Sequence, residues 1–217
     1  MKKYLSITLI SIMSCVFCQV KTEQPSKTLE AYLAKLPKNN EVVKSLVEAI
    51  EKGNDRVKIY SIKALGNIKE AGAFDIFMDF VGYGINSKLI NKPAYQNYDW
   101  EIRMEAAMAL AQLGDTNAVP KLQSILRQEQ NTMVQKAIIY ALGELKAKEA
   151  VPILTDLLQI TKEETLVIEC VKALGKIGDK SAFLPLLTVS TGNHLPVTKA
   201  EAIKSLESIN WNTAEKK

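Results

Sequence analysis

Residues 134–158 read VQKAIIYALGELKAKEAVPILTDLL, and this stretch decides the fold. Apolar residues at helical spacing run from Val134 to Leu145, and a second apolar run with a proline near its start follows Ala150. Two such runs joined by a few polar residues predict two antiparallel helices.

The same helical hairpin recurs along the chain. Its most regular feature is an Ala-Leu or Ser-Leu pair that recurs every 32 residues. The first residues of these pairs are Ala109, Ala141, Ala173 and Ser205. An earlier pair at Ala64 stands 45 residues before Ala109, so one repeat carries 45 − 32 = 13 extra residues. A fixed period in this range indicates stacked copies of one supersecondary unit. We therefore expect an all-α, right-handed solenoid of four to five antiparallel helix pairs.

One level of the repeat carries small residues directly after these pairs: Gly66, Ala111, Gly143 and Gly175. We expect these residues to let neighbouring first helices approach closely. A phosphate-binding role is not expected, because they stand inside helical stripes rather than in a strand-to-helix loop.

The resemblance to a known family rests on two paired motifs. Units of the form Val-Arg-x-x-Ala-x-x-Ala-Leu-Gly, followed by Ala-Val-Pro-x-Leu-x-x-x-Leu, resemble the short HEAT repeats first recognised in phycobilisome lyases. The nearest matches are residues 102–111 with 118–126, and 134–143 with 150–158. The resemblance covers about residues 28–211 and implies a HEAT/armadillo-like superhelix. Such repeats recur widely in proteins without a chromophore substrate, so it does not by itself imply lyase activity.

Two further short stripes precede the regular repeats. Residues 29–36 carry leucines at helical spacing and end at Pro37, and residues 42–50 carry a second apolar stripe that ends at Gly53. We interpret them as a divergent first unit that caps the stack.

The N-terminus resembles an export signal. Lys2 and Lys3 precede an apolar run over residues 4–13, which is too short to span a bilayer as a helix. We therefore predict a signal peptide over residues 1–14 and a flexible tether over residues 15–27. A buried first helix is the alternative reading of the apolar run.

Residues 12–15, Ile-Met-Ser-Cys, also resemble a bacterial lipobox, which favours lipidation of Cys15. Ordinary signal cleavage after Cys18 remains open. The export hypothesis places the protein in the periplasm, held to a membrane through its N-terminal lipid.

Composition and charge exclude several function classes. The chain has 217 residues, of which 47% are hydrophobic and 24% are charged. Its 28 basic residues exceed its 24 acidic residues by 28 − 24 = 4, and the two kinds are interspersed along the sequence. A nucleic-acid partner is not expected, because such domains carry a dense basic face. One histidine, His194, cannot build a multi-ligand metal centre, and Cys170 occupies a core position of the repeat. We expect no enzyme activity and no cofactor.

The 13-residue insertion, within about residues 82–99, is the first candidate binding site. Insertions in solenoids map to loops on one face, and Tyr, Trp and Arg are common interface anchors. The candidate residues there are Tyr83, Lys88, Lys92, Tyr95, Tyr98, Trp100 and Arg103. An equally open reading is that these aromatics fold back as a packing plug.

The second candidate is the concave surface that the second helices are expected to line, with Lys121 and Arg127 among its polar residues. Its mixed charge favours a protein or peptide partner. We predict a non-catalytic, exported protein-interaction scaffold. The alternatives are an accessory factor for cofactor or chromophore attachment and a structural adaptor of an envelope complex. Residues 212–217 read as a polar tail.

Overall fold

The computed structural model of the protein describes residues 41–82 and 99–211. This part of the chain is helical and contains no strand. Its ten α-helices are α3 (Glu41–Lys52), α4 (Asp55–Asn67), α5 (Phe74–Val81), α6 (Trp100–Leu113), α7 (Val119–Leu126), α8 (Thr132–Glu144), α9 (Val151–Ile160), α10 (Glu164–Ile177), α11 (Phe183–Thr191) and α12 (Pro196–Glu207). None of these helices is long and apolar enough to cross a membrane.

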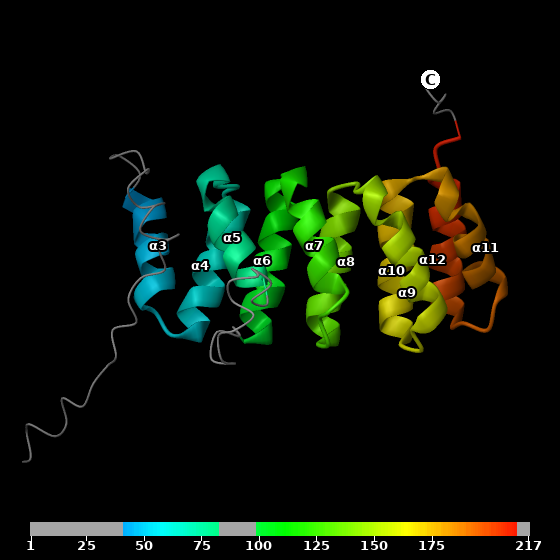
Figure 1. The fold of residues 1–217 in the computed structure, drawn as a ribbon, viewed down its shortest axis with the longest axis horizontal. Coiled ribbons are helices and arrows are strands. Elements are labelled where there is room, and N and C mark those ends of the chain that lie inside the picture. Colours follow the sequence, from blue (N-terminus) through cyan, green and yellow to red (C-terminus); the bar gives the residue numbers. More distant parts are fainter. Residues whose placement is uncertain (1–40, 83–98, 212–217) are drawn as a thin grey trace, which may run out of the picture.

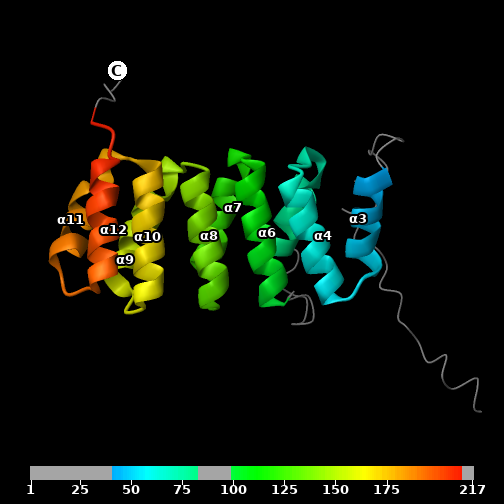
Figure 2. The same cartoon turned by 180° about the vertical axis from the view of Figure 1, so that it is seen from behind.

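The helices form two layers of a solenoid, as predicted. Figures 1 and 2 show α4, α6, α8, α10 and α12 side by side in one layer and α5, α7, α9 and α11 in the other. Each first helix packs against the first helix of the next unit, and each second helix packs against the first helix that follows it. Helix α3 packs against α4 in the same way, at one end of the stack.

The small residues of the repeat set how closely the first helices approach. A Cβ atom on Gly66 would lie 2.9 Å from the Cβ of Ala109, and one on Gly143 would lie 2.8 Å from the Cα of Ala173. Such distances are shorter than real Cβ contacts, so the helices touch at the level that the sequence predicted.

The turn inside each hairpin has a left-handed residue at its centre. Gly114 and Gly178 take φ angles of 78° and 67° there, as expected for glycine. The equivalent residues of the other two units are Lys69 and Lys146, with φ angles of 53° and 50°. A non-glycine residue in this region costs about 1 kcal/mol or more, so two turns hold a strain that the other two lack.

The core follows the predicted stripes in the later units, where Leu113 and Leu206 are half-buried, and departs from them most at the first described pair. Leu65, Leu110, Leu142 and Leu174 are fully buried between the layers. In α4, however, Val57 is 39% exposed, and Ile68, which follows that helix, is 52% exposed. These residues lie on the predicted apolar face of α4, but no described helix covers that face.

Candidate functional site

The chain enters and leaves the predicted insertion at one edge of the solenoid, where α5 ends and α6 begins. Asp99 caps α6, because its carboxylate accepts a hydrogen bond from the backbone N–H of Glu101 at 3.0 Å. Trp100 begins the helix and is half-buried against the core. Trp100 therefore serves at least partly as a packing residue. Tyr83, Lys88, Lys92, Tyr95 and Tyr98 lie outside the described residues.

Lys121 of α7 lies beside the start of the same connection. A Cβ atom on Gly82 would lie 2.9 Å from Cε and 3.1 Å from Nζ of Lys121, so the lysine side chain covers the glycine. Partial burial lowers the pKa of Lys121, against the attraction of Asp79 and Asp75 on α5. Lys121, a residue of the second-helix layer, therefore lies beside Gly82, the last described residue before the insertion.

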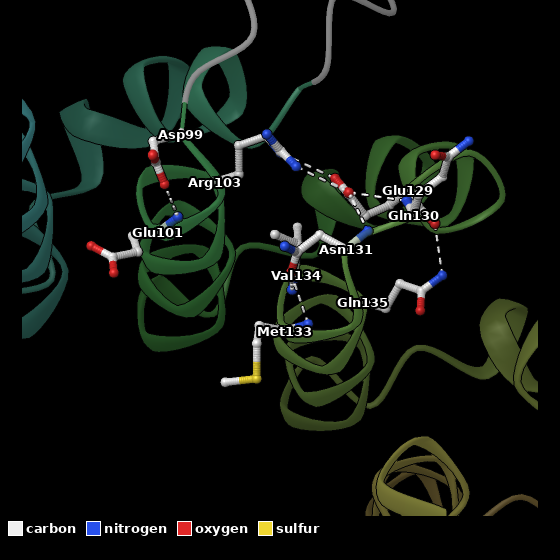
Figure 3. A network of polar contacts seen from close by, with 9 residues as sticks. All are labelled: Asp99, Glu101, Arg103, Glu129, Gln130, Asn131, Met133, Val134 and Gln135. Carbon is white, nitrogen blue, oxygen red and sulfur yellow. Dashed lines mark hydrogen bonds and ion pairs between the residues drawn. The ribbon is translucent and has the colours of Figure 1, made fainter. Parts of the chain in front are cut away.

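The prediction that Arg103 binds a partner needs correction. Its guanidinium group makes two hydrogen bonds to Glu129, Nε to Oε2 at 3.1 Å and Nη2 to Oε1 at 3.0 Å. The two side chains are only 9% and 2% exposed. Arg103 is therefore a buried structural residue, because its position on α6 turns it toward the connection that follows α7 rather than toward solvent (Figure 3).

Glu129 organises that connection as well as the ion pair (Figure 3). Its Oε1 atom accepts hydrogen bonds from the backbone N–H groups of Gln130 at 3.0 Å and Asn131 at 2.9 Å. The side chain of Gln135 donates to the Glu129 carbonyl at 2.7 Å. Asn131 in turn caps α8. One carboxylate thus joins the start of α6 to the start of α8.

Glu129 was missed from the sequence because it stands in a connection, outside the periodic stripes. The repeat gave no signal at its partner either. The repeat position of Arg103 is held in other units by Lys58, Gln135, Val167 and Lys199, and only the valine among these is buried. The burial of Arg103 therefore depends on Glu129, which neutralises its charge.

The second-helix layer presents a polar surface on α7 and α9. Arg127, Asp156 and Gln159 are exposed, whereas Lys121, Gln123, Ser124 and Thr155 are half-buried. Arg127 stands at the C-terminal end of α7, where a cation interacts favourably with the helix dipole. The mixture of charges on this layer fits a protein surface better than a polyanion.

Two titratable groups away from this region, Cys170 and His194, have structural roles. Cys170 is fully buried, and burial raises the pKa of its thiol, which makes it a poor nucleophile. His194 lies 2.8 Å from Glu164, between Nδ1 and Oε1, and links the α11–α12 connection to the start of α10. The described residues contain no group of three side chains that could hold a metal ion.

The comparisons with known proteins agree with this geometry. Two segments, residues 88–137 and 119–207, match the family described as HEAT repeats, and together they span more than half of the chain. A comparison with curated protein sequences gives no match.

A solved structure of the complex of CpcE and CpcF of phycocyanin lyase from Nostoc sp. contains a chain of similar fold. The alignment has a TM-score of 0.56 and 22% sequence identity, and it covers 87% of this chain and 67% of that chain. At this identity the likeness concerns the fold alone. The matched segments and the stacked hairpins together show that this chain belongs to the HEAT-repeat proteins.

Proposed function

We propose that the protein is a non-catalytic interaction scaffold that binds a protein or peptide partner where the insertion meets the second-helix layer. The observation that carries this proposal is the packing of Lys121 over Gly82. It brings a half-buried cation of α7 to the point where the insertion begins. Insertions on solenoids commonly lie on the binding face, and here a polar, mixed-charge surface adjoins one.

The test is capture of a partner from native envelope extract, with bound proteins identified by mass. Two variants separate the surfaces: Tyr95→Ala with Tyr98→Ala for the insertion, and Lys121→Ala for α7. Trp100 is left intact, because its removal would also disturb the core. Lys204→Ala is the matched control, since Lys204 is an exposed lysine on α12.

A protein held by the wild type and by the control, but lost with either variant, supports the proposed face. Equal recovery with every variant contradicts it. If the double tyrosine variant loses much of its helical circular dichroism, the insertion acts as a packing plug instead, and the protein is better explained as a structural adaptor.

The proposal includes export and a lipid anchor on Cys15, supported by the leader-like residues 1–14 and the lipobox-like sequence before the cysteine. Cys15 lies outside the described residues. Replacement by alanine, Cys15→Ala, is expected to release the protein from membranes in fractionation. Unchanged fractionation would exclude the anchor and leave ordinary cleavage near Cys18.

A second candidate is an accessory factor for cofactor or chromophore attachment. The structural likeness to a chain of the phycocyanin lyase complex favours this reading. Its discriminating observation is absorbance: protein purified from its source would carry a chromophore or bind one in titration. A colourless preparation that captures a protein partner favours the scaffold.

A further inference from the structure

Helix α11 differs from the other helices in charge. Among the α-helices that the structure describes, it alone contains no Asp, Glu, Lys or Arg. Leu184 and Leu187, one turn apart on its outer side, are nevertheless 68% and 38% exposed. The equivalent residues of α7 and α9 are not large and aliphatic: Pro120 and Gln123, and Pro152 and Thr155. The repeat therefore does not require leucine at these surface positions.

Three hydroxyl groups beside the leucines bond to the backbone of the same helix. Thr188 Oγ1 donates to the carbonyl of Leu184 at 3.0 Å, and Thr191 Oγ1 donates to the carbonyl of Leu187 at 3.0 Å. Ser190 Oγ also donates to the Leu187 carbonyl, at 2.8 Å. The protons of these hydroxyl groups are therefore already engaged. An uncharged, apolar surface of this kind is typical of the centre of a protein interface, where charged residues are depleted.

Charged residues of the same layer lie on the other second helices. Helix α7 has Lys121, which covers Gly82, and Arg127 at its C-terminal end. Lys121 experiences the attraction of Asp79 and Asp75 on α5. Arg127 is exposed and forms no ion pair with any residue that the structure describes. Arg127 is therefore available to a carboxylate of another molecule.

We propose that this layer binds an extended segment of the protein partner, with a large apolar side chain against Leu184 and Leu187 and a carboxylate against Arg127. The inference rests on the proposed function and names the chemistry of its partner. Charge decides which end of the segment lies where. A carboxylate over α9 would be repelled by Asp156, and one over α11 would meet no cation. An apolar side chain over Arg127 would bury that charge without a partner.

The arrangement of the helices sets the spacing of the two groups. Helices α7, α9 and α11 follow one another in one layer (Figure 1). Packed helices lie about 8–10 Å apart, so α7 and α11 are separated by roughly 20 Å. An extended chain rises about 3.3 Å per residue, so the carboxylate and the apolar side chain belong about six residues apart.

The first test selects binders of the full chain from a phage library of random peptides of about 12 residues, twice the required span. We expect enriched peptides to carry a large apolar residue and an aspartate or glutamate about six residues apart. Selection on Arg127→Glu should replace the acidic residue by lysine or arginine, while the apolar residue persists. Arg56→Glu is the matched control and should leave the selected sequences unchanged, because Arg56 is an exposed arginine of α4 in the other layer.

The second test measures the binding of one selected peptide by fluorescence polarisation. Leu184→Lys with Leu187→Lys should weaken binding at least about tenfold, because it removes the apolar contact and leaves charges to be buried. Tyr60→Lys should leave binding unchanged, since Tyr60 is equally exposed, at 70%, but lies on α4. Because both leucines are exposed, the helical circular dichroism of the double variant should match the wild type.

Three results overturn the proposal. They are a library without enrichment, enriched peptides that lack this pair of residues, and peptides that bind the leucine variant as tightly as the wild type. A change in the oligomeric state of the leucine variant, seen by sedimentation, also overturns it, because α11 would then bind a second copy of this chain.

Capture from native extract separates this inference from the proposed function. A partner that depends on Lys121 but is held equally by the leucine variant leaves the proposed function standing and overturns the chemistry inferred here. Peptides of the expected chemistry that bind equally well to Tyr95→Ala with Tyr98→Ala support this surface and contradict the role of the insertion.

Discussion

The buried ion pair of Arg103 and Glu129 allows the sharpest test of the structure. We consider Glu129→Gln, which keeps the size of the side chain and leaves an amide oxygen that can still accept from the two backbone N–H groups. The arginine side chain is 9% exposed, so it would remain buried without its counter-charge. Breaking one partner of a buried pair costs about 3–5 kcal/mol.

The expected loss is large relative to the stability of a single domain, which is of order 5–15 kcal/mol. For a chain of this length, 1 kcal/mol corresponds to about 2–4 °C, so Glu129→Gln should lower the melting temperature by at least ~6 °C. The assay is thermal and urea unfolding followed by circular dichroism. Arg103→Met should cost a similar amount, and the double variant should cost less than the two single losses added, because it removes the uncompensated charge.

Glu201→Gln is the matched control, since Glu201 pairs with Lys204 across one turn of α12 and that lysine side chain is 75% exposed. Exposed pairs contribute at most about 1 kcal/mol. If Glu129→Gln shifts the melting temperature no more than this control does, the pair is not a buried structural contact and the correction to Arg103 is wrong. Additive losses in the double variant would also refute the reasoning.

Three further outcomes follow from single positions. Gly143→Ala should destabilise by about 1–3 kcal/mol, because its Cβ would lie 2.8 Å from the Ala173 backbone; unfolding at wild-type urea concentration would contradict this. Lys146→Gly should be neutral or stabilising by up to ~1 kcal/mol in the same assay, since it relieves a positive φ, whereas a clear loss would show that the lysine side chain compensates. Hydrogen bonds from Thr198 and then His194 lower the pKa of Glu164, so that its contribution is present above the ordinary glutamate pKa and is lost as pH falls through the folded value. Melting curves from neutral to acidic pH should show less acid sensitivity for Thr198→Val than for the wild type, and identical curves would contradict the assignment.

The periodic residues made most of the fold predictable from the sequence. The alanine and leucine positions located the core, the glycines located the close approach of Gly143 to Ala173, and Pro120 and Pro152 marked the starts of second helices. These inferences succeed because every copy of the repeat places the same position in the same environment. These inferences depend only on the spacing of residues within one unit and on the packing of that unit against its nearest neighbours.

The residues that the period could not predict lie where one unit differs from its neighbours. Lys146 takes the left-handed conformation that Gly114 and Gly178 take in the equivalent turns of other units. Val57 belongs to the predicted stripe, but no described helix covers that side of α4 and the valine is 39% exposed. Arg103 looked like an exposed anchor because its partner, Glu129, stands in a connection of irregular sequence.

The junction of α6 and α8 combines several of these departures. It follows the insertion, it has Ala111 where three other units have glycine, and it contains the Arg103–Glu129 pair. A buried ion pair adds little stability over well-packed apolar residues, so we expect this pair to act mainly by fixing the geometry of the junction. Because one carboxylate binds both the guanidinium of α6 and the N–H groups ahead of α8, the start of α6 is held in a fixed position. The proposed binding site at the insertion would therefore adjoin a fixed helix end, since Asp99 caps the start of α6.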